Sequence, residues 1–386
     1  MKNKLNESDC FQSLKIVIID QPKDMVKMRQ DWDQLFVSCH QDSPFLSYAW
    51  HYAWWMSYIE TGLEGELSIV CVYQDKTLLA LVPLYLDGES KSSVKSVRFI
   101  GQLAKDQFVP SCIQADILIA PVASLLNKQV EAILVSYFMV LAKQHNIKIN
   151  CLSEQSVLYP LVRKLPKQYS LQRNTQLEVC RFSLPTSFEG FIQSQSSHWL
   201  TSYQSYQAKL AQLEDKLEYR FYTEPHEMYS AVESFSQISC SQQRRYTKGN
   251  CLFDNDKYTS LHESLSYQLA LKENGGVASL ILDGHLLASS CYVVDKNVLH
   301  IYQSAEVKSE DFAGFSSSAV LMLAIIKQSI DRQLNFVSIL SNNDGILPHF
   351  TQGDPQCLYN VRVFKNRGRV YLENSVRKLY RALTHR

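Results

Sequence analysis

The chain has 386 residues, of which 46% are hydrophobic and 20% are charged. These values are typical of a folded protein rather than a disordered one, and the length allows two domains. The net charge of +1 gives no electrostatic argument for a nucleic-acid partner. Neither G-x-x-x-x-G-K-[ST] nor G-x-G-x-x-G occurs, which disfavours nucleotide hydrolysis and Rossmann-type dinucleotide binding.

The cysteines, the histidines and the N-terminus bear on metal content and location. The ten cysteines stand singly, without a C-x-x-C pair, and the histidines lack ligand spacing, so we expect no metal site. Residues 1–10 are polar and do not resemble a signal peptide, so we expect a cytoplasmic protein with reduced thiols. The longest apolar runs, such as residues 78–84, fall short of the ~20 residues of a membrane-spanning helix. We therefore expect no transmembrane segment.

The first half of the chain alternates strand and helix signals. Helices are predicted at residues 23–39 and 127–144, and strands at residues 14–20, 67–73, 77–86, 97–100, 117–119 and 147–152. The aromatic-rich stretch at residues 44–55 contains Trp50 and Trp54. It is interpreted either as a helix that packs rings into the core or as part of a substrate groove, because aromatic clefts are common ligand sites.

The second half begins with a predicted strand at residues 177–184. Helices follow at residues 187–217, 225–238 and 258–273. Strands are then predicted over residues 277–294, with a turn at 283–285, and over 298–305 and 336–340, with an apolar helix at 317–333. From residue 359 apolar and basic residues alternate. Residues 242–250 form a predicted basic loop, either solvated or in contact with a phosphate. A basic amphipathic helix from about residue 373 is a packed terminal helix or a peripheral membrane contact.

A short internal repeat indicates two copies of one unit. Residues 75–80 read Asp-Lys-Thr-Leu-Leu-Ala, and residues 283–288 read Asp-Gly-His-Leu-Leu-Ala. Each copy continues into a long apolar helix and a strand that ends in Leu-Ser. The predicted fold is therefore α/β with mixed sheets, in two units at residues 1–176 and 177–386, the second opening with linking helices. The first copy lacks glycine between residues 106 and 127, so we expect no cofactor there.

Three stretches resemble a known family. They are Trp32-x-x-Leu35 followed by Ser-Pro-Phe-Leu-Ser-Tyr-Ala-Trp at 43–50; Leu-Val-Pro-Leu-Tyr-Leu at 81–86 leading to Val-Arg-Phe-Ile-Gly at 97–101; and Leu-Leu-Ala at 286–288 through Ile301-Tyr302 to the Gly314 loop and its helix. Together they resemble the tandem GNAT-superfamily acyltransferases of the CelD-like kind. They are more distantly similar to the FemAB peptidyltransferases.

The resemblance implies transfer of an acyl group, such as acetyl, from acyl-CoA to an amine or hydroxyl. The acceptor would be a small molecule, a sugar or an envelope precursor. The start of a helix offers backbone N–H groups to an anion, which suits a pyrophosphate. The implied cofactor-binding residues are the oxyanion donors near Ser304 and Ala305 and the pyrophosphate loop Gly314, Phe315, Ser316, Ser317 and Ser318.

Candidate catalytic residues lie on the strand and loop before the helix. They are His300, Glu306 and Asp311 as proton acceptors, and Tyr302 and Tyr292 as proton donors to the leaving thiolate. Because strand residues alternate between faces, we expect His300, Tyr302 and Ser304 to share one face. Each position also has a purely structural interpretation: His300 as a core histidine, Tyr302 as a core aromatic residue, and Glu306 and Asp311 as solvated acids. Tyr292, Trp50 and Trp54 are the candidate substrate-binding residues.

Two other functions stay open. The loop around Gly314 keeps one glycine of the superfamily pattern Gln/Arg-x-x-Gly-x-Gly/Ala, which is compatible with a scaffold that binds a partner in envelope or polysaccharide assembly without chemistry. A FemAB-like transferase that uses aminoacyl-tRNA is disfavoured by the near-neutral charge, because tRNA binding requires a basic face.

Overall fold

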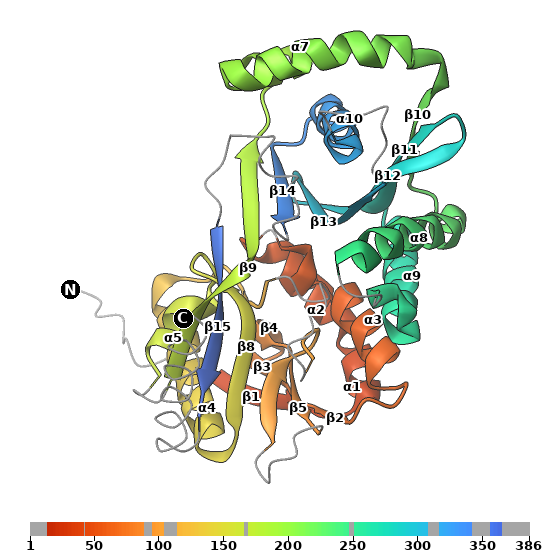
Figure 1. The fold of residues 1–386 in the computed structure, drawn as a ribbon. Helices are drawn as coiled ribbons and strands as arrows, with labels where there is room; N and C mark the ends of the chain where they lie inside the picture. Colours follow the sequence, from red (N-terminus) through yellow and green to blue (C-terminus); the bar gives the residue numbers. More distant parts are fainter. Residues whose placement is uncertain are drawn as a thin grey trace, which may run out of the picture.

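The computed structural model describes residues 14–41, 43–88, 95–103, 114–165, 169–246, 251–307, 316–341 and 356–364. It confirms the predicted mixed α/β fold (Figure 1). We call residues 14–165 the first unit and residues 184–341 the second unit. The predicted boundary at residue 177 falls inside one long strand, β9 (Tyr169–Ser183), which runs between the two units.

In its described residues, the first unit is built from four short α-helices and the long helix α4 around two sheets. Its elements are β1 (Leu14–Ile19), α1 (Pro22–Lys27), α2 (Arg29–Ser38), η1 (Pro44–Leu46), α3 (Tyr48–Tyr58), β2 (Gly65–Leu67), β3 (Ile69–Gln74), β4 (Thr77–Val82), β5 (Leu84–Asp87), β6 (Ser96–Phe99), β7 (Leu118–Ile119), α4 (Ser124–Gln144), β8 (Asn146–Ser153) and α5 (Leu158–Arg163).

The second unit begins with helices and continues as a sheet. Its elements are α6 (Phe188–Gln193), α7 (Ser197–Gln212), η2 (Glu214–Lys216), β10 (Leu217–Tyr222), η3 (Pro225–Glu227), α8 (Met228–Tyr246), η4 (Leu252–Asp254), α9 (Asp256–Leu271), β11 (Gly275–Leu282), β12 (His285–Asp295), β13 (Val298–Glu306), α10 (Ser317–Asp331) and β14 (Phe336–Ser341), and β15 (Gln356–Val363) follows them.

One sheet of eleven strands passes through both units. Its order is β10-β11-β12-β13-β14-β9-β15-β8-β6-β5-β2, while β1-β3-β4-β7 form a separate sheet in the first unit. The central strand β9 pairs with β14 through residues 178–183 and with β15 through residues 169–179. Because β15 also pairs with β8, the last described strand completes the sheet of the first unit.

The two units share a hairpin and a parallel pair of strands, which lie in one sheet in the second unit and in two sheets in the first. The hairpins β3–β4 and β11–β12 turn at Asp75 and at Asp283-Gly284, where the φ angles of 54°, 49° and 79° are positive. Glycine and aspartate tolerate this left-handed region better than most residues. In each unit a long helix, α4 or α10, then leads into a strand that pairs in parallel, as β6–β8 and β13–β14. The short sequence repeat thus marks equivalent hairpins.

Helices cover both faces of the second unit's sheet. The apolar α10 buries residues such as Val320 and Ile325 against one face, and α7 lies beyond it (Figure 1). The opposite face packs against α8 and α9, and α3 of the first unit contacts α9. The sheet of the second unit is therefore enclosed between its own helix layer and the first unit.

Several predicted elements are wrong in detail. The predicted helix at residues 187–217 is divided into α6, α7 and η2 and ends in the edge strand β10, which pairs with β11. The predicted helix at 225–238 begins as the 3-10 helix η3, and α8 continues to Tyr246. Arg244 and Arg245 therefore lie on the last helical turn and not in a loop.

The membrane prediction needs a qualification. Helix α4 is, by length and composition, apolar enough to cross a membrane. Its apolar residues do not form one uninterrupted run, because Lys128 and Glu131 lie among them. In this structure α4 packs Leu134 and Phe138 into the core of the first unit. The basic tail from residue 373 lies outside the described residues.

Candidate functional site

Strands β13 and β14 separate after four paired residues. They run in parallel from Val298 opposite Phe336 to Ile301 opposite Ile339. Beyond these pairs β13 continues to Glu306 without a registered partner on β14. Backbone groups on this edge of residues 302–306 are therefore not paired with β14 and need other hydrogen-bond partners.

A β-bulge lies where the strands separate. Along β12, Tyr292 pairs with Ile301 and the adjacent Cys291 pairs with Gln303, so Tyr302 is the extra residue. A bulge breaks the alternation of side chains and is frequent beside active sites. Tyr302 packs in the cluster on the α9 face, whereas the Ser304 hydroxyl lies 2.9 Å from the Ser290 hydroxyl on the α10 side. His300 and Tyr302 therefore share the α9 side, as expected, whereas Ser304 lies on the α10 side, so the expectation of one common face is wrong for Ser304.

His300 is the predicted catalytic residue that lines a cavity between the two units. The cavity has a volume of about 590 Å³, within the range of small-molecule sites. Its second-unit wall comes from β13, β14 and the end of β9, and its first-unit wall from the segments after α2, around β7 and after β8. The polar lining residues include His40, Gln41, Ser43, Gln114, Asp116, Asn127, Ser153, Gln155, Ser156, Arg181, His300, Ser338 and Gln356.

Tyr302, Trp50 and Trp54 form part of a buried aromatic cluster instead of a cavity wall. The ring of Tyr302 meets Trp50 edge-on, with centroids 5.3 Å apart, and Trp54 stacks on Tyr58. All three are at most 2% exposed. Burial raises the pKa of Tyr302 well above its ordinary value, so its phenol stays protonated. In this conformation the two tryptophans contribute packing, and their predicted substrate contact stays a prediction.

Tyr292 lies on the other face of the sheet, in the cluster covered by α10. It is 2% exposed, and burial raises the pKa of its phenol. A Cβ atom added to Gly276 would lie 2.6 Å from the Tyr292 hydroxyl, so the strand opposite needs glycine there. The two candidate proton donors therefore lie on opposite faces of the sheet.

The start of α10 is occupied by a carboxylate of the chain itself. The Ser318 backbone N–H donates to Glu306 Oε2 at 3.0 Å, and the Ser317 hydroxyl donates to the same oxygen at 3.3 Å. Ser316 caps the helix by accepting from the Ala319 N–H. The predicted base Glu306 thus faces the helix start rather than the cavity. Gly314, Phe315 and Asp311 lie outside the described residues, and Ala305 is buried in the α9-side core.

A buried polar network beside the bulge was missed by sequence reasoning. The Gln303 amide donates to the Tyr258 hydroxyl and lies 3.2 Å from Nε2 of His262, both on α9. Burial lowers the pKa of His262 to about 3, so this ring is neutral near pH 7. Gln303 therefore links the bulge to α9. The sequence signal for this network was Gln303 itself, a polar amide within a mostly apolar predicted strand.

The corresponding opening in the first unit is bridged by a side chain. Strands β6 and β8 pair in parallel only at Ser96–Asn146 and Val97–Ile147. Further along, the amide of Gln102 donates to the Asn150 carbonyl at 2.8 Å and accepts from the Asn150 N–H at 3.0 Å. Gln102 is 4% exposed. The Gln102 side chain therefore joins β6 and β8 beyond their paired residues. In the second unit the equivalent backbone of β13, beyond Ile301, has no paired residue on β14.

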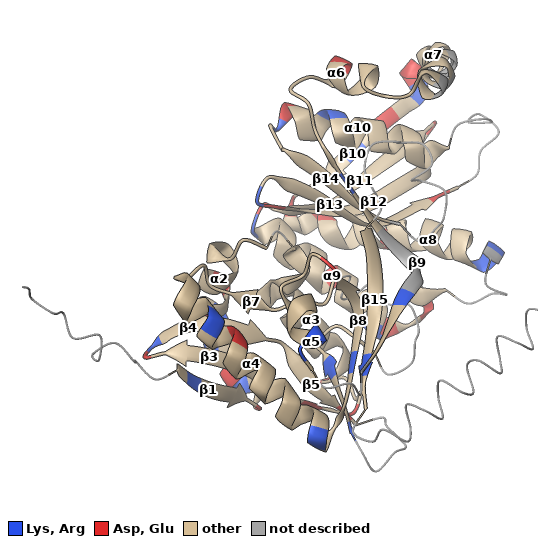
Figure 2. Cartoon of the chain, turned by 90° about the vertical axis from the view of Figure 1, so that its left-hand side faces the viewer, with Lys and Arg blue, Asp and Glu red and all other residues tan. Residues whose placement is uncertain are grey.

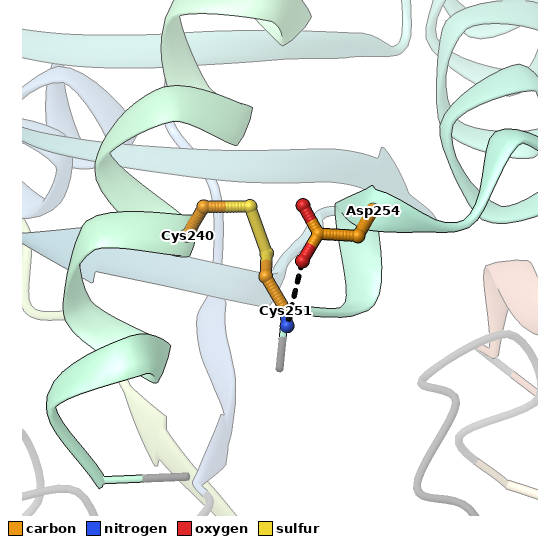
Figure 3. Close-up of side chains that lie close together, drawn as sticks. All are labelled: Cys240, Cys251 and Asp254. Atoms are coloured by element: carbon orange, nitrogen blue, oxygen red, sulfur yellow. Dashed lines mark hydrogen bonds between the residues drawn. A yellow bond between two sulfur atoms is a disulfide. The ribbon is translucent and has the colours of Figure 1, made fainter. Parts of the chain in front are cut away.

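Two cysteines correct the expectation of reduced thiols. Cys240 of α8 and Cys251 before η4 form a disulfide, because the fold brings their Cα atoms to 5.1 Å (Figure 3). With Asp254 they are also a close group of potential metal ligands. In this state the sulfurs are bonded to each other, and Asp254 accepts from the Cys251 N–H and from Arg244. These atoms are therefore already engaged.

The comparisons agree with this arrangement of strands. Residues 201–345 match the profile of a family described as "Acetyltransferase (GNAT) domain". No curated protein matches the sequence. A conserved protein of unknown function from Bacteroides thetaiotaomicron shares the fold with a TM-score of 0.56 and 9% identity, covering 90% of this chain and 100% of its own. FemX has a TM-score of 0.58 and 8% identity, covering 93% of this chain and 99% of its own.

The matched segment contains β13, the separation from β14, and α10. At these identities the solved structures show a shared fold only. The second unit is accordingly similar to acetyltransferase (GNAT) domains, in a chain whose fold resembles that of FemX.

Proposed function

We propose that the second unit transfers an acyl group, such as acetyl, from acyl-CoA to an amine or hydroxyl acceptor. The observation that supports this most is the end of β13–β14 pairing at Ile301 and Ile339, one residue beyond His300 and Ser338. A thioester held between the strands would reach the cavity that these two side chains line. The match of residues 201–345 to acetyltransferase domains supports the same site.

The chemistry assigned to the site needs one proton acceptor and one anion stabiliser. The acceptor's nitrogen or oxygen attacks the thioester carbonyl carbon, and the new bond forms as the carbon–sulfur bond breaks and CoA leaves as a thiolate. His300 lines the cavity and takes the proton that the nucleophile loses. Backbone N–H groups at the bulge, near Ser304 and Ala305, stabilise the oxyanion, and one such donor is worth about 2.7–4 kcal/mol.

The first unit is assigned the role of a wall without a cofactor. Gln102 bridges β6 and β8 where a thioester would otherwise lie, and residues such as Asp116 and Ser153 supply the far side of the cavity. Described acidic and basic residues are scattered over both units rather than gathered in one groove (Figure 2), which gives no support to a tRNA substrate. We retain residues 1–176 and 177–386 as the proposed functional division.

One observation favours the alternative of a scaffold without chemistry. Glu306 places a carboxylate on the Ser318 N–H, where a pyrophosphate would bind in the resemblance. A pyrophosphate would have to displace this carboxylate. We also propose that the chain is of the CelD-like kind, that its acceptor is envelope-related and that it is cytoplasmic. The Cys240–Cys251 disulfide weighs against the cytoplasmic location, because disulfides are commoner in oxidising compartments.

Thermal unfolding with acetyl-CoA, longer acyl-CoAs and free CoA tests the proposal. A ligand at 100 times its dissociation constant adds about 2.7 kcal/mol to the free energy of unfolding. Ser318→Asp, at the second residue of α10, should abolish this gain by charge repulsion. Leu125→Asp, at the second residue of α4 in the first unit, should leave it unchanged. No stabilisation of the parent by any thioester would favour the scaffold.

A further inference from the structure

The Cys240–Cys251 disulfide fastens the end of α8 to the segment before η4 (Figure 3). The side chains that α8 buries in the core, such as Phe235 and Ile238, all precede Cys240 among its described residues. Residues 241–245 are half-buried or exposed. A helix end that buries few apolar side chains opens at low cost, so the disulfide has a large share in fixing the last turns of α8.

The end of α8 in turn holds the end of β13. Gln242, two residues after Cys240, accepts from the Glu306 backbone N–H with its side-chain oxygen at 3.2 Å. Glu306 is also the residue whose carboxylate accepts from the Ser318 N–H at the start of α10. A continuous path of bonds therefore leads from the disulfide through Gln242 and Glu306 to the helix start that an acyl-CoA pyrophosphate would use.

The segment on the other side of the disulfide also reaches β13, through α9. The Phe253 ring of η4 lies 4.8 Å from that of Tyr258 and 5.5 Å from that of His262, measured between centroids. These two α9 side chains contact the Gln303 amide at the bulge. Both segments that the disulfide joins therefore support β13 beyond Ile301, where its pairing with β14 has ended.

The disulfide lies close to solvent and can be reduced. A carboxylate oxygen of Asp254 lies within 4.8 Å of both sulfurs, and the Asp254 side chain is 48% exposed. A thiolate of a dithiol attacks one sulfur, forms a mixed disulfide and releases the other sulfur as a thiolate. The second thiol of the reductant then closes its own disulfide, so two electrons and two protons pass to Cys240 and Cys251. In a reducing compartment disulfides are usually transient in this way.

We propose that the Cys240–Cys251 disulfide is a reversible redox switch that holds the Glu306 carboxylate on the start of α10. With the bond intact, Gln242 fixes the Glu306 backbone and the helix start stays capped by the chain itself. After reduction the last turns of α8 open, Glu306 loses this bond, and its carboxylate leaves Ser318 more readily. Tighter acyl-CoA binding by the reduced protein follows only if the proposed function holds. The coupling itself would exist in a non-catalytic scaffold as well.

Amide hydrogen exchange of the full chain, before and after reduction with dithiothreitol, tests the coupling without a ligand. Peptides covering residues 301–306 and 317–320 should exchange about two- to tenfold faster after reduction, as expected for the loss of one hydrogen bond. Peptides covering residues 14–19 of β1 should not change, which separates local opening from global unfolding. Thiol titration verifies that the bond has been reduced.

Three variants locate the path. Cys240→Ser combined with Cys251→Ser should exchange at the fast rate with or without dithiothreitol, which also excludes an effect through the other cysteines. Gln242→Ala should exchange fast in both states although its disulfide is intact. Gln237→Ala is the matched control, because Gln237 is an exposed glutamine of the same helix, and it should respond to reduction as the parent does.

Isothermal titration of the same preparations with acetyl-CoA separates the switch from the proposed function. The reduced parent should bind about two- to tenfold more tightly than the oxidised parent. Redox-dependent exchange without any acetyl-CoA binding would refute the proposed function and leave the switch standing. Exchange that is independent of redox state, a bond that dithiothreitol cannot reduce in the folded protein, a redox response retained in Gln242→Ala, or acetyl-CoA binding that is equal or weaker after reduction would overturn the switch.

Discussion

Replacement of Glu306 by glutamine should make the protein less stable and its acyl-CoA affinity higher. In the ligand-free protein the carboxylate accepts from the Ser318 N–H at 3.0 Å and from the Ser317 hydroxyl. Glutamine keeps an acceptor oxygen but loses the negative charge at the helix start, and that loss costs about 0.3–1 kcal/mol. The same carboxylate competes with the pyrophosphate for the helix start. Two unit negative charges about 8 Å apart repel each other by about 2 kcal/mol at an effective dielectric constant of 20.

Two titrations measure the opposing effects. Urea unfolding of Glu306→Gln should give a free energy lower by about 0.3–1 kcal/mol, and isothermal titration should give acetyl-CoA affinity higher by about tenfold or more. Asp254→Asn is the control, because Asp254 caps η4 by accepting from the Cys251 N–H. It should lose stability without a change in affinity. If Glu306→Gln binds acetyl-CoA no better than the parent, the cofactor does not use the start of α10.

Two further predictions concern buried polar groups. Gln102→Ala leaves the Asn150 N–H and carbonyl without the Gln102 amide, so unfolding should cost about 1–3 kcal/mol less while acyl-CoA binding stays unchanged; an unaltered urea midpoint would contradict this. His262 has a folded pKa of about 3, below its ordinary 6.5, so its contribution to stability is present above pH 6.5 and lost on acidification. From pH 7 to 5 the parent should lose about 2 kcal/mol through this ring, and a His262→Gln variant with the same pH slope would refute the assignment.

The sequence predicted the order of elements where a local pattern determines them. The Asp-x-x-Leu-Leu-Ala repeat marked two equivalent hairpins because their turns need residues that accept positive φ. The apolar run of α10 identified a helix buried between sheet and helices. The division of residues 187–217 into two helices and a strand was not visible, because β10 is half-exposed and its pairing with β11 is a long-range contact.

The candidate site was predicted in part. His300 was identified, and the structure places it at the cavity. Its expected relation to Ser304 was wrong because a bulge adds one residue to β13, and an added residue leaves no mark on the hydrophobic pattern. Arg181, Gln102 and the Cys240–Cys251 disulfide were missed, because each depends on residues that only the tertiary fold brings together.

The position of β15 has a consequence for biosynthesis. The Cys151 N–H donates to Asn360 Oδ1, a contact between residues 209 positions apart, and β15 lies between β8 and β9. During translation, residues 14–183 leave the ribosome long before the strand that completes their sheet. The facing edges of β8 and β9 therefore lack this partner until β15 has been synthesised, and such edges favour intermolecular pairing. A nascent chain or an isolated first unit thus requires protection that the finished protein does not.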